Sequence, residues 1–313
     1  MKKRRLYGNS LKEQFQASRM DRMYNFILAD GTLRGCMVNG TRMINEMRWN
    51  HELGILETLV LGHAYLGAVL MSSNLKGNDR LGLQIECSGP IRGLSVEANA
   101  FGEVRGYLKQ VPIHIEKPLE SFDLSPFFGA GFLSVTKYLE DAKQPFIGKV
   151  MMEHGRIAKD LAVYHLKSEQ IASAFNLSVF FDKAGVVQGA GGLMIQALPG
   201  ADENILAQIE DSVQALESIG EIVNTSRFPD QWLESSFGAF EPRMLSSRGV
   251  EFMCHCNVDR ISAMMAMLKP EDLEDMAVNG PFPIEIRCHY CNTIYAFTKE
   301  QITVIRNMRR PDN

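Results

Sequence analysis

The chain contains the stretch Ile284-Glu-Ile-Arg-Cys288-His-Tyr-Cys291-Asn-Thr-Ile-Tyr-Ala-Phe297, in which two alternating segments flank a pair of cysteines. Alternation of apolar and polar residues is typical of strands with one buried face. We therefore predict two short strands, 284–288 and 293–297, joined by a tight turn that carries both cysteines. A Cys-x-x-Cys pair in such a turn is typical of a knuckle that binds zinc.

A second pair of cysteines precedes this hairpin. Cys254 and Cys256 form a Cys-x-Cys motif, and 31 residues separate it from Cys288. Four thiolates in two close pairs suit the tetrahedral coordination of zinc. The predicted ligands are Cys254, Cys256, Cys288 and Cys291. His255 and His289 lie inside the two pairs and are alternative ligands, but four thiolates already complete the shell.

The segment 251–313 is predicted to form a small domain around this site. Helical patterns cover 259–268 and start again at Pro270, and Thr298-Lys-Glu-Gln301 is a capping box for a last helix. So short a domain buries little apolar surface, whereas structural zinc supplies on the order of 10–16 kcal/mol in small domains. Each cysteine pair can also close on itself under oxidation and release the metal. Zinc and oxidant therefore act in opposite directions on one folding equilibrium.

The segment 201–250 is strongly acidic, with nine acidic and three basic residues. Apolar residues recur within it near the spacing of a helix. They are Leu206, Ile209, Val213, Leu216 and Val223. An apolar stripe must pack against another surface, which is either the large domain, as a permanent part of the fold, or a partner protein. We predict an acidic, amphipathic, helical linker.

Residues 1–200 are predicted to form one mixed domain. The pattern over 52–75 favours a mostly buried helix, and 168–175 is predicted to be a second helix. Short apolar or alternating segments predict strands over 81–85, 94–98, 102–106, 133–138, 177–181 and 192–197. Because these strands follow one another with short turns, an antiparallel sheet is favoured. The predicted fold class is α+β: a large mixed domain with an antiparallel sheet, a helical linker and a small C-terminal zinc domain.

Composition limits the classes of protein that are plausible. The chain has 313 residues, of which 45% are hydrophobic and 22% charged, so a substantial core can form. A net charge of −4 disfavours nucleic-acid binding. We expect no membrane span, no secretory signal after the basic start Met1-Lys-Lys-Arg-Arg5, and a cytoplasmic protein. Cys36 and Cys87 stand alone and are expected to serve in packing.

These motifs resemble those of the heat-shock protein 33 family of redox-regulated holdase chaperones. In the tail the matching segments are Glu251-Phe-Met-Cys-His-Cys256, Val258-Asp-Arg260, Ile286-Arg-Cys-His-Tyr-Cys291 and Tyr295-Ala-Phe297. In the large domain they are Gly102-Glu-Val-Arg-Gly106, Gln144-Pro-Phe-Ile-Gly148, Asp160-Leu-Ala, Tyr164, Ser168-Glu-Gln170 and Gly191-Gly-Leu-Met-Ile-Gln-Ala-Leu-Pro-Gly200. The resemblance covers nearly the whole chain.

The resemblance implies a stress-response chaperone that is not an enzyme and needs no nucleotide. The reduced form would bind one zinc ion per chain through the four cysteines and be inactive. Oxidation would link Cys254 with Cys256 and Cys288 with Cys291, and zinc would leave. The tail (251–313) and linker would then unfold, and the core (1–200) would bind unfolding client proteins and form a homodimer.

Departures from the family pattern are modest and remove no ligand. Asn257 and Val258 follow the first cysteine pair, where polar residues are more usual, and the 31-residue gap is a little long. These differences leave the oxidation threshold open. The acidic face of the linker explains how it stays soluble when exposed. We hypothesise that its apolar stripe masks part of the client site when it is folded.

Three other functions are compatible with single features. A nucleic-acid-binding zinc module lacks support because the tail carries seven basic and nine acidic residues. A thiol–disulfide oxidoreductase would place its Cys-x-x-Cys pair at a helix N-terminus, and not between two strands. A nucleotide-binding enzyme is disfavoured because Gln188-Gly-Ala-Gly-Gly192 has the wrong spacing, and a hairpin turn is the better interpretation. His63 and His165 lie in apolar stretches typical of core histidines.

Overall fold

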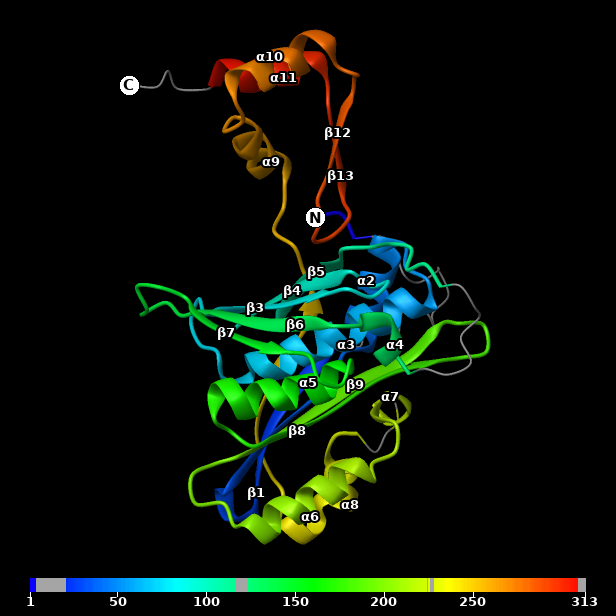
Figure 1. Ribbon diagram of the computed structural model, residues 1–313, viewed down its shortest axis with the longest axis vertical. Helices are drawn as coiled ribbons and strands as arrows, with labels where there is room; N and C mark the ends of the chain where they lie inside the picture. Colours follow the sequence, from blue (N-terminus) through cyan, green and yellow to red (C-terminus); the bar gives the residue numbers. More distant parts are fainter. Residues whose placement is uncertain (4–20, 116–122, 224, 226–227, 309–313) are drawn as a thin grey trace. The chain divides into compact units, whose positions relative to one another are not determined.

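The computed structural model describes residues 1–3, 21–115, 123–223, 225 and 228–308 (Figure 1). The chain forms two compact units, and each is described by itself. The large unit spans Arg4–Phe252, and the small unit combines Met1–Lys3 with Met253–Asn313. The α+β class predicted from the sequence is confirmed, with antiparallel sheets, helices and a C-terminal cysteine cluster.

The first sheet of the large unit has five antiparallel strands. They are β1 (Arg22–Leu28), β2 (Leu33–Asn39), β8 (Ser173–Phe181), β9 (Val187–Ala197) and β10 (Arg243–Gly249). The order across the sheet is β10-β1-β2-β9-β8, so the last strand of the linker pairs with the first described strand of the chain. The sequence analysis predicted neither β1, β2 nor β10.

The second sheet has six strands in the order β11-β5-β4-β3-β6-β7. They are β3 (Arg80–Cys87), β4 (Gly93–Asn99), β5 (Glu103–Leu108), β6 (Gly131–Tyr138), β7 (Phe146–Met151) and β11 (Glu251–Phe252). All neighbours are antiparallel except β11, which runs parallel to β5. Four of these strands, β3 to β6, match predicted segments, whereas β7 and β11 were not predicted.

Helices lie between the two sheets and beside them (Figure 1). The large unit contains α2 (Thr41–His51), α3 (Ile55–Met71), α4 (Ser125–Phe128), α5 (Ile157–Tyr164), α6 (Glu203–Gln214), α7 (Ile219–Ile222) and α8 (Asp230–Phe237), with a π-helical turn at His165–Glu169. Helix α3 contacts strands of both sheets and is apolar on nearly every face, because both sheets bury it. The stretch Ile55–Asn74 is long and apolar enough to cross a membrane by length and composition alone, yet 89% of its apolar window is buried inside the protein.

Two local predictions for the large unit are wrong. The segment 168–175 is not a helix, because the left-handed Gln170 ends the π-helical turn and Ser173 then begins β8. The run Gln188-Gly-Ala-Gly-Gly192 is not a hairpin turn but lies inside β9. Its glycines allow α7 to approach, since a Cβ at Gly189 would lie 1.7 Å from the carbonyl oxygen of Gly220.

The small unit contains three helices and one hairpin among its described residues. They are α9 (Val258–Met265), α10 (Pro270–Asn279), α11 (Lys299–Met308) and the antiparallel strands β12 (Ile284–Arg287) and β13 (Ile294–Phe297). The predicted capping box is confirmed. The Thr298 amide donates to Gln301 Oε1 at 2.9 Å, and the Gln301 amide donates to Thr298 Oγ1 at 3.4 Å.

The isolated cysteines and the two core histidines lie in the large unit. Burial raises the pKa of Cys36 to about 12, and Cys87 is half-buried at the end of β3. Burial also lowers the pKa of His63 and of His165 to about 4. Burial of the Cys36 thiol favours the packing role expected from the sequence, and for Cys87 that role stays a prediction.

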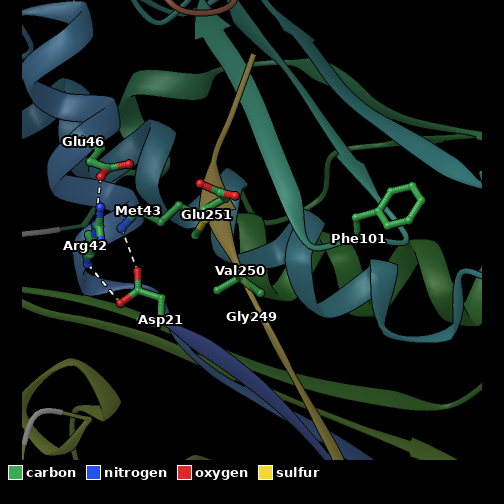
Figure 2. A pocket seen from close by; sticks show the side chains of 8 residues that line it. All are labelled: Asp21, Arg42, Met43, Glu46, Phe101, Gly249, Val250 and Glu251. Carbon is green, nitrogen blue, oxygen red and sulfur yellow. Dashed lines mark hydrogen bonds and ion pairs between the residues drawn. The ribbon is translucent and has the colours of Figure 1, made fainter. Parts of the chain in front are cut away.

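A buried carboxyl group lies in a pocket of about 320 Å³ where β10 gives way to β11 (Figure 2). Asp21 accepts hydrogen bonds from the backbone amides of Arg42 and Met43 at the start of α2, and its carbonyl accepts from Val250. The two amides favour the carboxylate, but desolvation is the larger effect. Burial raises the pKa of Asp21 from 3.8 to about 7.

Asp21 should make the stability of the large unit depend on pH. Since its pKa is higher in the folded than in the unfolded chain, the folded state binds the proton more tightly. The stabilisation is complete below pH 3.8 and is lost as the pH rises through about 7. At about 1.4 kcal/mol per pKa unit, we expect a loss on the order of 2–3 kcal/mol between pH 5 and 8. Urea unfolding of wild type and Asp21→Asn isolates this contribution; equal pH slopes in the two proteins would contradict it.

A candidate metal centre and a covered apolar surface

The turn after β12 and the irregular segment 253–257 bring four cysteines of the small unit together. The Sγ atoms of all four lie within 4.8 Å of one another. The distance between the sulfurs of Cys254 and Cys288 is 3.8 Å, and that between the sulfurs of Cys256 and Cys291 is 3.3 Å. Both of these contacts join one pair to the other, which makes the cluster one site and not two.

The turn between β12 and β13 has the form predicted from the sequence. The Cys288 amide donates to the Thr293 carbonyl at 2.9 Å, and the Asn292 amide donates to the Cys288 carbonyl at 2.7 Å. Asn292 has a φ of 55°, in the left-handed region that asparagine tolerates. These bonds place the sulfurs of Cys288 and Cys291 on the same side of the turn, toward the other pair.

A layer of polar groups holds the second pair. The Tyr295 hydroxyl contacts both the carbonyl oxygen of Cys256 at 2.9 Å and its sulfur at 3.1 Å. The amino group of Met1 donates to the same carbonyl at 2.7 Å. The sulfur of Cys291 lies 3.2 Å from Thr293 Oγ1. Tyr295 belongs to the segment Tyr295-Ala-Phe297 that resembles the family, but the supporting role of these residues was not predicted, because nothing in their spacing marks it.

The donor set fits a tetrahedral ion. A zinc–sulfur distance of about 2.3 Å in tetrahedral geometry places neighbouring sulfurs about 3.8 Å apart, close to the separations observed. The thiols also need a cation to ionise together. Hydrogen bonding with Cys254 raises the pKa of Cys288 to about 11, and hydrogen bonding with Cys254 and Cys288 raises the pKa of Cys291. His255 and His289 are exposed and do not belong to the cluster among the described residues.

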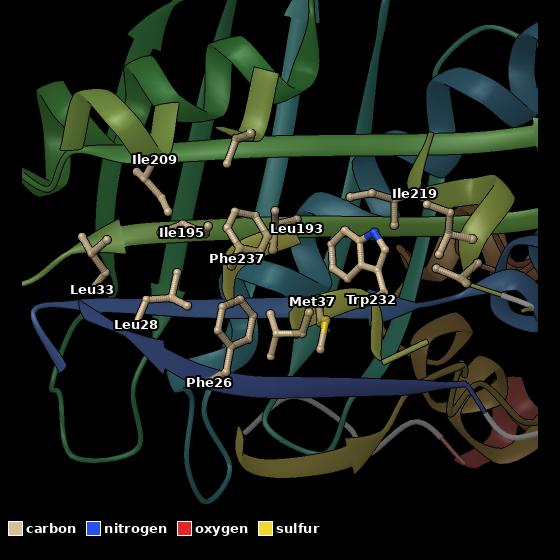
Figure 3. Packing of buried hydrophobic residues seen from close by; sticks show 14 residues of the cluster. Phe26, Leu28, Leu33, Met37, Leu193, Ile195, Ile209, Ile219, Trp232 and Phe237 are labelled. Atoms are coloured by element: carbon tan, nitrogen blue, oxygen red, sulfur yellow. The ribbon is translucent and has the colours of Figure 1, made fainter. Parts of the chain in front are cut away.

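A second feature of functional interest is the surface beneath the acidic linker. Helices α6, α7 and α8 lie on one face of the five-stranded sheet and form a single buried cluster with it (Figure 3). The sheet contributes Phe26, Leu28, Leu33, Met37, Leu193 and Ile195. The linker contributes Ile209, Val213, Ile219, Ile222, Val223, Trp232, Leu233 and Phe237. The predicted stripe thus packs on the five-stranded sheet of the same unit, whereas the apolar residues of α8 were not predicted.

Comparison with known proteins adds to this geometry. The family model described as "Hsp33 protein" matches residues 21–298. The 33 kDa chaperonin of Lachnoclostridium phytofermentans is 32% identical over 88% of this chain and 94% of its own length. The 33 kDa chaperonin of a Geobacillus species is 30% identical over 94% and 99%. The crystal structure of the Thermotoga maritima 33 kDa chaperonin superimposes with a TM-score of 0.83 at 31% identity, covering 93% of this chain and 99% of that one.

The fold and the four-cysteine cluster together define a molecular chaperone with a thiol centre in its C-terminal part. The chain belongs to the Hsp33 family. Relatives named chaperonins belong to a non-enzymatic class, and a role in binding unfolded proteins follows from the family.

Proposed function

We propose that this protein is a redox-regulated holdase chaperone whose reduced, metal-bound form is inactive. The observation that carries the proposal is the single cluster of four sulfurs within 4.8 Å in a small unit. Cys254, Cys256, Cys288 and Cys291 would hold one zinc ion. When bound, the ion supplies positive charge that stabilises four thiolates and cross-links the two cysteine pairs.

Oxidation is the proposed switch. Two thiols that close to one disulfide give up two electrons and two protons, and one molecule of hydrogen peroxide takes them up to form two molecules of water. We propose the pairs Cys254–Cys256 and Cys288–Cys291. Each disulfide removes two ligands from the site, so the ion can no longer be retained.

The conformational consequence follows from the size of the small unit. A domain of this length buries too little apolar surface to stay folded without its cross-link. We propose that residues 251–313 act as the redox-switch domain and 201–250 as a cover that opens with it. The core, 1–200, would then bind unfolding client proteins in the cytoplasm and form a homodimer.

One experiment tests the switch as a whole. Zinc content, free thiols and suppression of aggregation of a chemically denatured test protein are measured on the same sample before and after peroxide at raised temperature. We expect one zinc ion and four of the six thiols to be lost as suppression appears. Peptide mapping should find the two disulfides within the pairs, and Cys87→Ser should behave as wild type. Equal suppression in both states, or zinc retained after oxidation, would refute the proposal.

A further inference from the structure

The second sheet ends in a strand with a free outer edge among the described residues. No strand of the described chain pairs with β7 on the side away from β6. The Met152 amide donates to the Gly131 carbonyl at 2.9 Å. Since hydrogen-bonded pairs alternate in an antiparallel ladder, the backbone groups of Ile147, Lys149 and Met151 point away from β6. This row of donors and acceptors is called the β7 edge below.

The side chains along the β7 edge are apolar and exposed. Ile147 is 69% exposed and Met151 62%, and both side chains lie on the same face of β7, whereas Phe146, at 59% exposure, lies on the opposite face. Phe132 lies opposite Met151 on β6 and is 47% exposed, so it extends the apolar surface inward from the edge. An isolated exposed apolar residue is ordinary, but a contiguous group on an open edge indicates a contact surface.

The β7 edge has little of the usual protection against strand pairing. Edge strands are normally guarded by charged side chains, proline or bulges. The one charged residue of β7 is Lys149, and its ammonium group lies 4.5 Å from the ring centre of Phe132, over the apolar surface. By contrast, the edge strand β10 carries Arg243 and Arg248 and two serines.

We propose that the β7 edge docks an extended, apolar segment of a non-native polypeptide by strand addition. The backbone groups at the edge require an extended partner chain, and the exposed side chains favour apolar residues in it. A second copy of this chain fits less well. Antiparallel pairing that matches the outward-pointing residues 147, 149 and 151 of two β7 strands would set Lys149 opposite Lys149, and like charges directly opposite destabilise a strand pair.

This inference rests on the proposed function, because it names a site for the same clients. The β7 edge is open in the folded form, so its binding of clients does not depend on the redox state. Because the reduced form is proposed to be inactive, this binding must be weak. The surface beneath the linker would add a second contact after oxidation, and two linked contacts hold a client far longer than either alone. The β7 edge would thus select extended segments, and the uncovered surface would retain them.

The test uses reduced, zinc-loaded full-length protein and a labelled peptide of alternating apolar residues, followed by fluorescence anisotropy. Lys149→Pro removes an amide that points outward, so it should leave the ladder to β6 in place. Ile147→Lys adds a charge to the edge. We expect each to weaken peptide binding roughly tenfold. Lys149→Ala, which keeps the amide, and Val186→Lys, on an exposed turn elsewhere, should bind as wild type.

Each outcome separates the alternatives. Unchanged peptide affinity in both Lys149→Pro and Ile147→Lys, with zinc content and circular dichroism intact, would overturn the docking proposal. A reduced dimer that Ile147→Lys dissociates, without loss of peptide binding, would overturn it in favour of self-pairing. Because the assay uses only the reduced form, a failure of redox activation would leave the result for the β7 edge standing.

Discussion

Replacing Cys291 with serine should leave the reduced protein without its metal ion and should unfold residues 253–308, while the large unit stays folded. Cys291 is fully buried, and its sulfur lies 3.3 Å from that of Cys256. Three thiolates and a hydroxyl bind zinc far less tightly than four thiolates. The ion that we propose would contribute on the order of 10–16 kcal/mol to the small unit, which the core of that unit cannot replace.

Metal analysis and limited proteolysis measure this effect directly. The variant should be cut rapidly within 253–308 and yield a stable fragment of the large unit, and a chelator should reproduce this pattern in the wild type. Cys87→Ser serves as the control, since Cys87 lies in the large unit outside the cluster. If metal-free Cys291→Ser resisted proteolysis as well as wild type, the small unit would not need the ion.

The double substitution Ile209→Asp and Val213→Asp should activate the reduced protein toward unfolded clients. Both side chains lie on the buried face of α6, at 3% and 5% exposure, against the five-stranded sheet. Burying an unpaired carboxylate costs on the order of 3–5 kcal/mol. The helix should therefore leave the sheet and uncover residues such as Phe26 and Leu193 without any oxidation.

The matched control is Gln208→Asp with Gln214→Asp, which adds the same charge on the exposed face of α6. Suppression of client aggregation and binding of an apolar dye are measured under reducing conditions with zinc bound. Activity should appear in the buried-face variant and not in the control. A buried-face variant that detaches α6 yet stays inert toward clients would show that the covered surface is not the client site.

Local sequence patterns predicted the small unit well. The hairpin around Cys288 and Cys291, the helix that starts at Pro270 and the capping box at Thr298 all depend on neighbours within a few residues. Such patterns can be recognised in a single sequence because alternation, capping and turn formation depend on residues close together in the chain. The four candidate ligands could be identified for the same reason, since their spacing reflects one coordination geometry.

Long-range pairing explains what the sequence analysis missed. Strand β10 is mostly polar and exposed, and it becomes a strand because it pairs with β1 more than two hundred residues away. The glycine run of β9 suggested a turn. Its glycines instead make room for Gly220 of α7, and a contact with a helix so distant in the sequence is not visible in the local pattern. The contacts of the Tyr295 hydroxyl with Cys256 likewise appear only once the hairpin faces Cys256.

Amide hydrogen exchange, followed in one sample before and after peroxide, tests the central claim most directly. The account predicts that oxidation with loss of zinc abolishes protection in 258–308 and in the linker helices over 203–237, while β2, β3 and β9 stay protected. Protection that persists throughout 258–308 after the metal has left and the disulfides have formed would contradict it.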